Sequence, residues 1–352
     1  MADSLGYHIY HFRGNLPDQI KEKLHVSKDI SFLKKPLGES IQTTSIKINI
    51  NREPSEKIDS SMMNNDVIVR RFFTDSVLEQ IYIAVPVHNA FIMRDETATE
   101  FQQRIVKDSN QKLIDVFGVN YIESNFTLVS SLIIVLKDDK VFSDNKSYYE
   151  SISQFVTHSY KIKSEHYSSI DNYQIVIDYE GVGIIFSSTV DLERVHRLIF
   201  ILMLGKAYLA TLEQISLGTV EPLNHNQNSY KEAEAIEHTL DMYNRFLIRY
   251  YYHNPIMVDV NKIFYVYERI KDVLKLRDQY NESKEQIRIL SELSNTKNRQ
   301  ILDMRTVEQQ EERQNERRFL EKIVGNINKI STIGFSVIIV ELVLILLLFL
   351  IK

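Results

Sequence analysis

The 352-residue sequence contains no cysteine and no tryptophan, and it has only 10 glycines and 6 prolines. Without cysteine, disulfides, thiolate metal sites and cysteine nucleophiles are all excluded. This absence fits a reducing compartment such as the cytoplasm. Without tryptophan, an aromatic belt at a membrane surface would have to be formed by tyrosine or phenylalanine.

The motifs of nucleotide-binding and hydrolytic enzymes are also missing. Neither GxxxxGK[ST] nor GxGxxG occurs, so the chain has no recognisable phosphate-binding loop. There is no GxSxG nucleophile elbow and no HExxH zinc motif. His8 and His11 share a predicted strand, but their spacing points them to opposite faces. We therefore predict a protein that is not an enzyme and that holds no metal and no cofactor.

The charge balance is slightly acidic, with a formal net charge of −5. General nucleic-acid binders usually carry a basic excess, so we expect no nucleic-acid partner. The first residues contain Asp3 and lack an apolar run of signal-peptide length. The N-terminal body is therefore expected to stay in the cytoplasm.

The most apolar stretch is Ile330–Ile351, which reads ISTIGFSVIIVELVLILLLFLI. About 20 apolar residues cross the ~30 Å hydrocarbon layer as a helix, so this segment is a predicted transmembrane helix. Basic residues concentrate before it, at Arg317, Arg318, Lys322 and Lys329, whereas Lys352 alone follows it. The positive-inside rule then predicts a single-pass, tail-anchored protein of the cell membrane with a cytoplasmic body.

Glu341 is the one charged residue inside this segment. A carboxylate at the bilayer centre costs about 2.5–3.5 kcal/mol or more, so it usually faces a partner helix or a watery cavity. In a single-span protein the partner comes from another chain, which predicts a homo-oligomer. A ring of Glu341 side chains could form a cation-selective constriction. A protonated Glu341 in an interhelical hydrogen bond, without conduction, needs fewer assumptions.

The N-terminal half shows strand-like alternation and β-branched or aromatic enrichment in several short segments. The predicted strands are Tyr7–Phe12, Thr44–Ile50, Asp66–Phe73, Ile81–Phe91, Phe126–Leu136, Tyr173–Tyr179 and Val182–Ser188. The last two flank Glu180-Gly181 and predict a hairpin. The order of strands and helices favours a sheet with helices on one face.

Three capping-box pairs mark predicted helix starts in the sequence. They are Thr97 with Glu100, Ser147 with Glu150, and Ser229 with Glu232. The apolar run in Val190–Leu217 stops at Lys206, which makes it too short for a span and favours a core helix.

The last soluble helix is expected to begin near Val258, with Ile263, Val266, Ile270 and Val273 at a and d positions of a heptad. A second seam follows after a register shift, at Ile287, Leu290, Ser294, Ile301 and Met304. From Val307 to Arg318 almost every residue is charged or amide, which predicts a solvated stalk. These patterns indicate a coiled coil whose heptad pattern is interrupted. The helix itself is expected to run nearly continuously into the membrane.

The predicted fold is α+β: an N-terminal α/β sheet domain, a helical layer, a long broken coiled-coil helix and one C-terminal transmembrane helix. The expected boundaries are 1–189, 190–256, 257–329 and 330–351, in that order.

Arg70, Arg71 and Arg94 lie at or beside predicted strands. If they line a cleft, they could hold a small anionic ligand such as a nucleotide. The alternative is charge on an edge strand, which discourages pairing between sheets.

An α/β cytoplasmic domain, a helical layer and one long helix entering the membrane resemble the CorA-type divalent-cation transporters. That family's Gly-Met-Asn motif and second membrane helix are not found in this sequence. The tail, with Glu341 inside Ile339–Val343, is similar to the RMND1/DUF155 family. The latter resemblance implies a membrane-tethered scaffold.

Two functions follow from these patterns. The first is an oligomer with a cytoplasmic sensing domain that conducts ions or disrupts membranes, as effectors of stress or anti-phage defence do. The second is a non-conducting scaffold that holds a protein partner at the bilayer. A membrane-tethered enzyme of an unrecognised kind is a third, supported only by the size of the α/β body.

Overall fold

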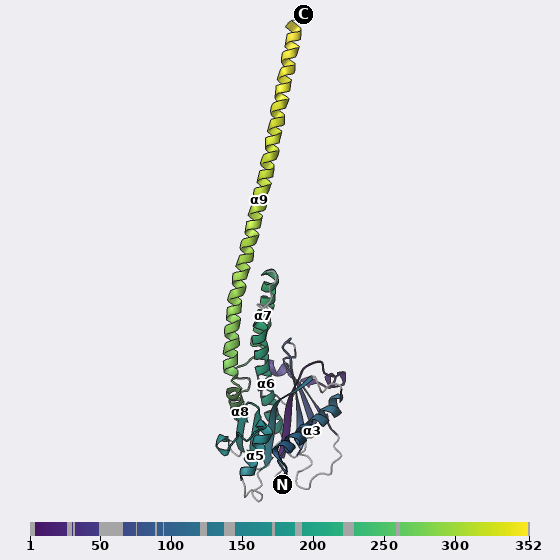
Figure 1. The fold of residues 1–352 in the computed structure, drawn as a ribbon, viewed down its shortest axis with the longest axis vertical. Helices are drawn as coiled ribbons and strands as arrows, with labels where there is room; N and C mark the ends of the chain where they lie inside the picture. The colour runs from purple at the N-terminus through teal and green to yellow at the C-terminus, as the bar shows by residue number, and fades with distance from the viewer. Residues whose placement is uncertain are drawn as a thin grey trace. The chain divides into compact units, whose positions relative to one another are not determined.

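A computed structural model describes the sheet, the helices around it and a long C-terminal helix (Figure 1). The described residues are 4–26, 30, 32–48, 66–74, 76–88, 90–93, 95–119, 125–136, 145–170, 173–186, 192–220, 229–257 and 261–350.

One nine-stranded sheet forms the centre of the described body, in the order β2-β3-β4-β5-β1-β6-β9-β8-β7. Its strands are β1 (Ser4–Phe12), β2 (His25–Val26), β3 (Gln42–Lys47), β4 (Asp66–Phe72), β5 (Gln80–His88), β6 (Phe126–Leu136), β7 (Ser168–Ile170), β8 (Tyr173–Asp178) and β9 (Gly181–Phe186). All neighbouring pairs are antiparallel except β6 and β9, which run parallel.

Strand β1 lies in the middle of the sheet, between β5 and β6. Its pairing with β6 changes register, because Ile9 is opposite Ser130 whereas Tyr10 is opposite Leu128. Val129 is the extra residue of this β-bulge. Bulges bend a strand and redirect side chains, often beside functional sites.

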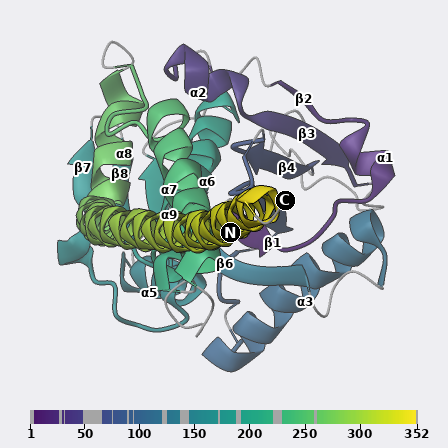
Figure 2. The same ribbon diagram turned by 90° about the horizontal axis from the view of Figure 1, so that it is seen from above.

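Eight α-helices are described besides the sheet: α1 (Asp18–Lys21), α2 (Lys35–Glu39), α3 (Ala98–Phe117), α5 (Asn145–Thr157), α6 (Leu192–Val220), α7 (Ser229–Arg249), α8 (Asn261–Val273) and α9 (Leu276–Leu350). Helices α3 and α5 cover one face of the sheet, and α6 and α8 cover the other (Figure 2). Helices from the N-terminal half do cover one face, as expected, and the helical layer buries the opposite one.

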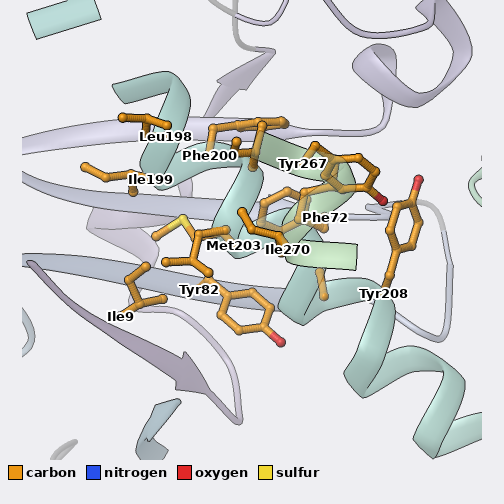
Figure 3. Close-up of a cluster of buried hydrophobic side chains, with 14 of the residues drawn as sticks. Ile9, Phe72, Tyr82, Leu198, Ile199, Phe200, Met203, Tyr208, Tyr267 and Ile270 are labelled. Atoms are coloured by element: carbon orange, nitrogen blue, oxygen red, sulfur yellow. The ribbon is translucent and has the colours of Figure 1, made fainter. Parts of the chain in front are cut away.

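The largest hydrophobic core lies between the sheet and α6 and α8 (Figure 3). Phe200 of α6 packs against Phe72 of β4 with ring centroids 5.8 Å apart, and Ile270 of α8 joins the same cluster. Although α6 is apolar enough to cross a membrane, 83% of its most apolar window is buried. The prediction that Val190–Leu217 forms a core helix is therefore confirmed.

Two of the three helix starts predicted from capping boxes agree with the structure. The Thr97 side chain accepts from the Glu100 amide and the Glu100 carboxylate accepts from the Thr97 amide, so the first capping box is present at α3. Helix α5 already begins at Asn145, which places Ser147 inside the helix and makes the second start wrong. Helix α7 begins at Ser229, as expected.

The expected hairpin is present, but its turn is Tyr179-Glu180 and Gly181 already belongs to β9. A Cβ on Gly181 would lie 2.1 Å from the Ser131 backbone oxygen. Glycine is thus required by close backbone approach between β6 and β9 rather than by turn geometry.

The helix expected to begin near Val258 is interrupted. Helix α8 ends at Val273, and Lys275 adopts a φ of 51° before α9 begins at Leu276. Ile263, Val266 and Ile270 are buried in the core with α6 and the sheet. The first predicted heptad seam therefore packs against the core of its own chain.

The described chain divides into two compact units: residues 1–224 with 238–288, and residues 225–237 with 289–352. In the second unit α7 and α9 are joined by an ion pair between Glu232 and Lys297. Asn298 Nδ2 also donates to Glu237 Oε1 at 3.1 Å. Leu290 and Ser294 of the second predicted seam are buried here. Beyond this region, every side chain from Leu302 to Leu346 is exposed in the described chain, and the solvated stalk stays a prediction.

Candidate functional site

An open cleft of about 770 Å³ lies at one end of the central strands. It is bounded by the end of β1, the start of β5, the start of β6, the turn between β8 and β9, and one side of α6. These elements come together because β1 runs antiparallel to both β5 and β6, which brings its end beside their beginnings.

Helix α6 supplies one wall of the cleft through residues at helical spacing. They are Lys206, Leu209, Ala210, Glu213, Gln214 and Leu217. This face combines a cation, a carboxylate, an amide and apolar side chains. Most of the other α6 residues preceding Lys206, from Leu198 to Leu204, are buried and apolar.

Lys206 is the deepest charged group of the cleft, with 5% of its surface exposed. Its Nζ donates a hydrogen bond of 2.7 Å to the Tyr179 carbonyl oxygen and lies 4.1 Å from the centroid of the Tyr179 ring. Burial lowers the pKa of Lys206 to about 8, and the charges of Glu213, Asp178 and Glu180 oppose that shift. An ammonium ion is held here at an energetic cost.

The opposite wall carries amide and imidazole groups. Gln80 Nε2 donates to Gln214 Oε1 at 3.2 Å, which links β5 to α6. His11 stacks on Tyr82 with ring centroids 5.0 Å apart. Burial lowers the pKa of His11, and the nearby Arg13 charge lowers it further.

The bulge residue Val129 lines the same cleft. The mouth also contains Arg13, Glu180 and Glu213, which are exposed. Cationic and anionic groups therefore face one space that also has apolar walls. Such a lining suits binding of a small molecule with both polar ends and an apolar part.

Metal chemistry has no visible support in the described segments, where no group of three or more His, Asp or Glu side chains is placed to hold an ion. The sequence has no cysteine to contribute.

A second polar cluster lies under α3, but it is closed. Ser109 Oγ is 3.1 Å from His8 Nδ1 and 2.8 Å from Tyr10 OH, and all three residues are buried. His8 stacks on Phe155 on the face opposite His11, as the spacing predicts. A serine beside a histidine with no access for substrate is a structural contact between β1 and α3.

Arg70 and Arg71 do not converge on a single site. Arg70 is buried, and its guanidinium lies 4.6 Å from the Phe200 ring centroid on the α6 side of the sheet. Arg71 points to the other face, where it forms a bidentate pair with Glu79 and donates to Gln42 at 3.0 Å. Arg94 lies outside the described residues. Because β4 is between β3 and β5, the edge-strand explanation is wrong for Arg70 and Arg71.

Glu341 lies in the exposed C-terminal part of α9. By length and composition this part is apolar enough to cross a membrane, and none of its most apolar window is buried in the described chain. The structure therefore shows a long helix with an uncovered apolar end. A soluble core does not account for those side chains.

Comparisons with known proteins found no matching family model, no matching curated protein and no matching solved structure. The resemblances to CorA-type transporters and to the RMND1/DUF155 family stay predictions.

Sequence reasoning missed the cleft. Lys206 did carry a signal, because it is a lone charge next to a strongly apolar run. Glu213 stands seven residues later, on the same helical face. His11, Gln80 and Val129 come from three different strands, and no short-range spacing connects them.

Proposed function

We propose that this protein is anchored in the cell membrane by the C-terminal part of α9, with its body in the cytoplasm, and that it self-associates through that helix. The observation that carries this proposal is a seam on α9 that is apolar except at Glu341. Its members alternate in steps of three and four residues: Leu320, Ile323, Ile327, Ile330, Gly334, Val337, Glu341 and Leu344. We call this set the α9 seam.

The α9 seam begins before the predicted span. Leu320 and Ile327 are 59% and 58% exposed, and the surrounding sequence is rich in charge. Lipid tails cannot cover side chains at this level, since the apolar run proper begins near Ile330. A heptad spacing is the pattern by which parallel helices bury such side chains against each other. A second copy of α9 therefore fits this surface.

The same face continues into the span as Gly334 and Glu341, one heptad apart. Small residues let membrane helices approach closely, and a polar residue at the interface supplies a hydrogen bond. Helices anchored from the same side are parallel, so Glu341 meets Glu341 at the same depth. This contact offsets the cost of about 2.5–3.5 kcal/mol for a lone acidic residue in the bilayer.

As function we propose an oligomeric membrane effector whose cytoplasmic body senses a ligand and whose α9 helices conduct ions or perturb the bilayer, as in stress or anti-phage defence. In a ring, Glu341 would supply the cation-selective carboxylates. The alternative is a scaffold that self-associates and recruits a protein partner without conducting.

Self-association can be tested by disulfide scanning, since the chain has no native cysteine. Ile323→Cys places a thiol on the α9 seam, and Gly325→Cys places one about 200° around the helix. Oxidation of the full-length protein in membranes should give dimers with Ile323→Cys and far fewer with Gly325→Cys. Equal cross-linking at both positions, or none at either, contradicts the seam.

Conduction is tested separately with the purified full-length protein in potassium-loaded vesicles. Glu341→Leu should abolish cation flux, and Glu341→Gln should reduce cation selectivity, while Ile323→Cys cross-linking persists in both backgrounds. If cation flux is unchanged while cross-linking is intact, the protein does not form a pore through Glu341. Replacing 330–351 by an unrelated span preserves function only if the protein is a scaffold.

A further inference from the structure

We propose that the cleft beside Lys206 binds a small zwitterion with an apolar body, the chemistry of an apolar amino acid or of a short peptide made from them. This binding involves only residues of the sheet and α6. It would supply the ligand for the sensing role proposed above, but it does not depend on membrane insertion or on self-association.

The cationic groups of the cleft fit a carboxylate. A lysine ammonium has three donors, and within the described chain Lys206 donates one hydrogen bond, to the Tyr179 carbonyl. A buried ammonium needs further acceptors. Arg13 lies at the mouth of the same cleft, so a ligand carboxylate would meet two cations.

The acidic groups of the cleft disfavour a multiply charged anion. Glu180 and Glu213 both line it, and both act electrostatically on Lys206. Glu213 lies two helical turns beyond Lys206 on the same face. These carboxylates would repel a phosphate but attract an ammonium group. Lysine and carboxylate groups within electrostatic range of each other match the two neighbouring charges of a zwitterion.

The space between the charged groups is apolar. Leu209, Leu217 and the bulge residue Val129 line it. Without the bulge, Val129 would pair in the β1–β6 ladder and its side chain would take another direction. The bulge therefore helps to form the surface that would contact a branched aliphatic side chain. A volume of about 770 Å³ admits a single amino acid or a dipeptide.

The test is calorimetric titration of the full-length protein in detergent micelles with leucine and with leucyl-leucine. We expect at least one of them to bind with a Kd below about 1 mM. A preference for leucine assigns the site to a free amino acid, and a preference for the dipeptide assigns it to a peptide. Two half-ligands, 4-methylpentanoate and isoamylamine, should bind at least about ten-fold more weakly.

Variants of cleft residues test whether the ligand binds in the cleft. Lys206→Met and Glu213→Gln should each weaken binding at least about ten-fold. Glu213 is exposed, so its replacement leaves folding intact. The matched controls Lys35→Met and Glu39→Gln remove a solvent-exposed ion pair on α2 and should leave binding unchanged. The proposal fails if neither ligand binds at about 10 mM, or if both cleft variants bind as the unmodified protein does.

Discussion

Lys206 and Tyr179 are in contact twice, through a hydrogen bond from Nζ to the Tyr179 carbonyl oxygen and through the position of Nζ above the Tyr179 ring. The two contacts hold an ammonium ion in a site from which water is largely excluded. Burial lowers the pKa of Lys206 from its ordinary value of 10.5 to about 8. A shift of this size corresponds to a folding cost of about 3 kcal/mol for the charged form.

Replacing Lys206 should therefore stabilise the body while it removes ligand binding. The folded-state pKa is below the unfolded-state value, so the cost is complete below pH 8 and disappears as pH rises from 8 to 10.5. Lys206→Met should raise the free energy of unfolding by about 1–2 kcal/mol at pH 7, since the Tyr179 carbonyl also loses a hydrogen bond. Urea unfolding at pH 7 and pH 10 measures this difference. A variant less stable than the parent at pH 7 would contradict the assignment of a costly buried charge.

The burial of His8 predicts that the folded body loses stability at acidic pH. Burial lowers the pKa of its imidazole to about 3, with a further lowering by His158 and Lys112 and an opposing effect of Asp108. Its contribution to stability is complete above pH 6.5 and is lost as pH falls towards 3. The protein should lose about 2–3 kcal/mol through His8 between pH 7.5 and pH 4.5.

The measurement is urea unfolding of His8→Phe and of the unmodified protein at both pH values. Because phenylalanine cannot be protonated, the stability difference should shift in favour of the variant at pH 4.5. The exposed His25→Phe serves as the control. The same pH response in His8→Phe and in the parent would show that folding does not lower the pKa of His8.

The backbone at the junction between α8 and α9 is strained, and a substitution there can relieve the strain. Lys275 has a φ of 51°, in the left-handed region that glycine adopts without a Cβ penalty. Lys275→Gly should stabilise the protein by up to about 1 kcal/mol, as at other helix C-termini. Lys275→Val should destabilise it, because a β-branched side chain is strongly disfavoured at positive φ. Thermal unfolding of the pair gives the sign, and the opposite order would refute this conformation at position 275.

Gly181 should tolerate no side chain. A Cβ at this position would lie 2.1 Å from the Ser131 carbonyl oxygen, so the parallel pairing of β6 and β9 would have to open. Gly181→Ala should cost more than about 3 kcal/mol, in the range of severe core substitutions. Gly218, in α6, has no atom within 4 Å of its Cβ position. Gly218→Ala should therefore be stabilising by about 0.5–1 kcal/mol. Equal denaturation midpoints for the two variants would contradict the close approach.

Elements with a local signature were predictable from the sequence. Enrichment in β-branched and aromatic residues located β4 within one residue of its end, and an apolar run located β6 at both of its ends. The capping box of Thr97 and Glu100 gave the start of α3. Each of these signals depends on neighbours within one or two turns of the chain.

The arrangement of those elements was not predictable in the same way. The position of β1 between β5 and β6 and the parallel pairing of β6 with β9 depend on contacts distant in sequence. The environment of Arg70 followed from that order, since an interior β4 places it against Phe200 of α6. The cleft could not be predicted from the sequence for the same reason, because its walls come from segments separated by up to about two hundred residues.

Lys206 also has a consequence for how the chain is sorted during synthesis. Two of the described helices, α6 and α9, are long and apolar enough to cross a membrane, by length and composition. A lysine at the centre of a membrane helix raises the free energy of insertion by about 2.5–3.5 kcal/mol. All nine strands of the described sheet precede α6 in the chain, so a nascent sheet is available to cover it as it emerges. The charge that makes α6 costly in the folded body therefore also raises the cost of placing this helix in a bilayer.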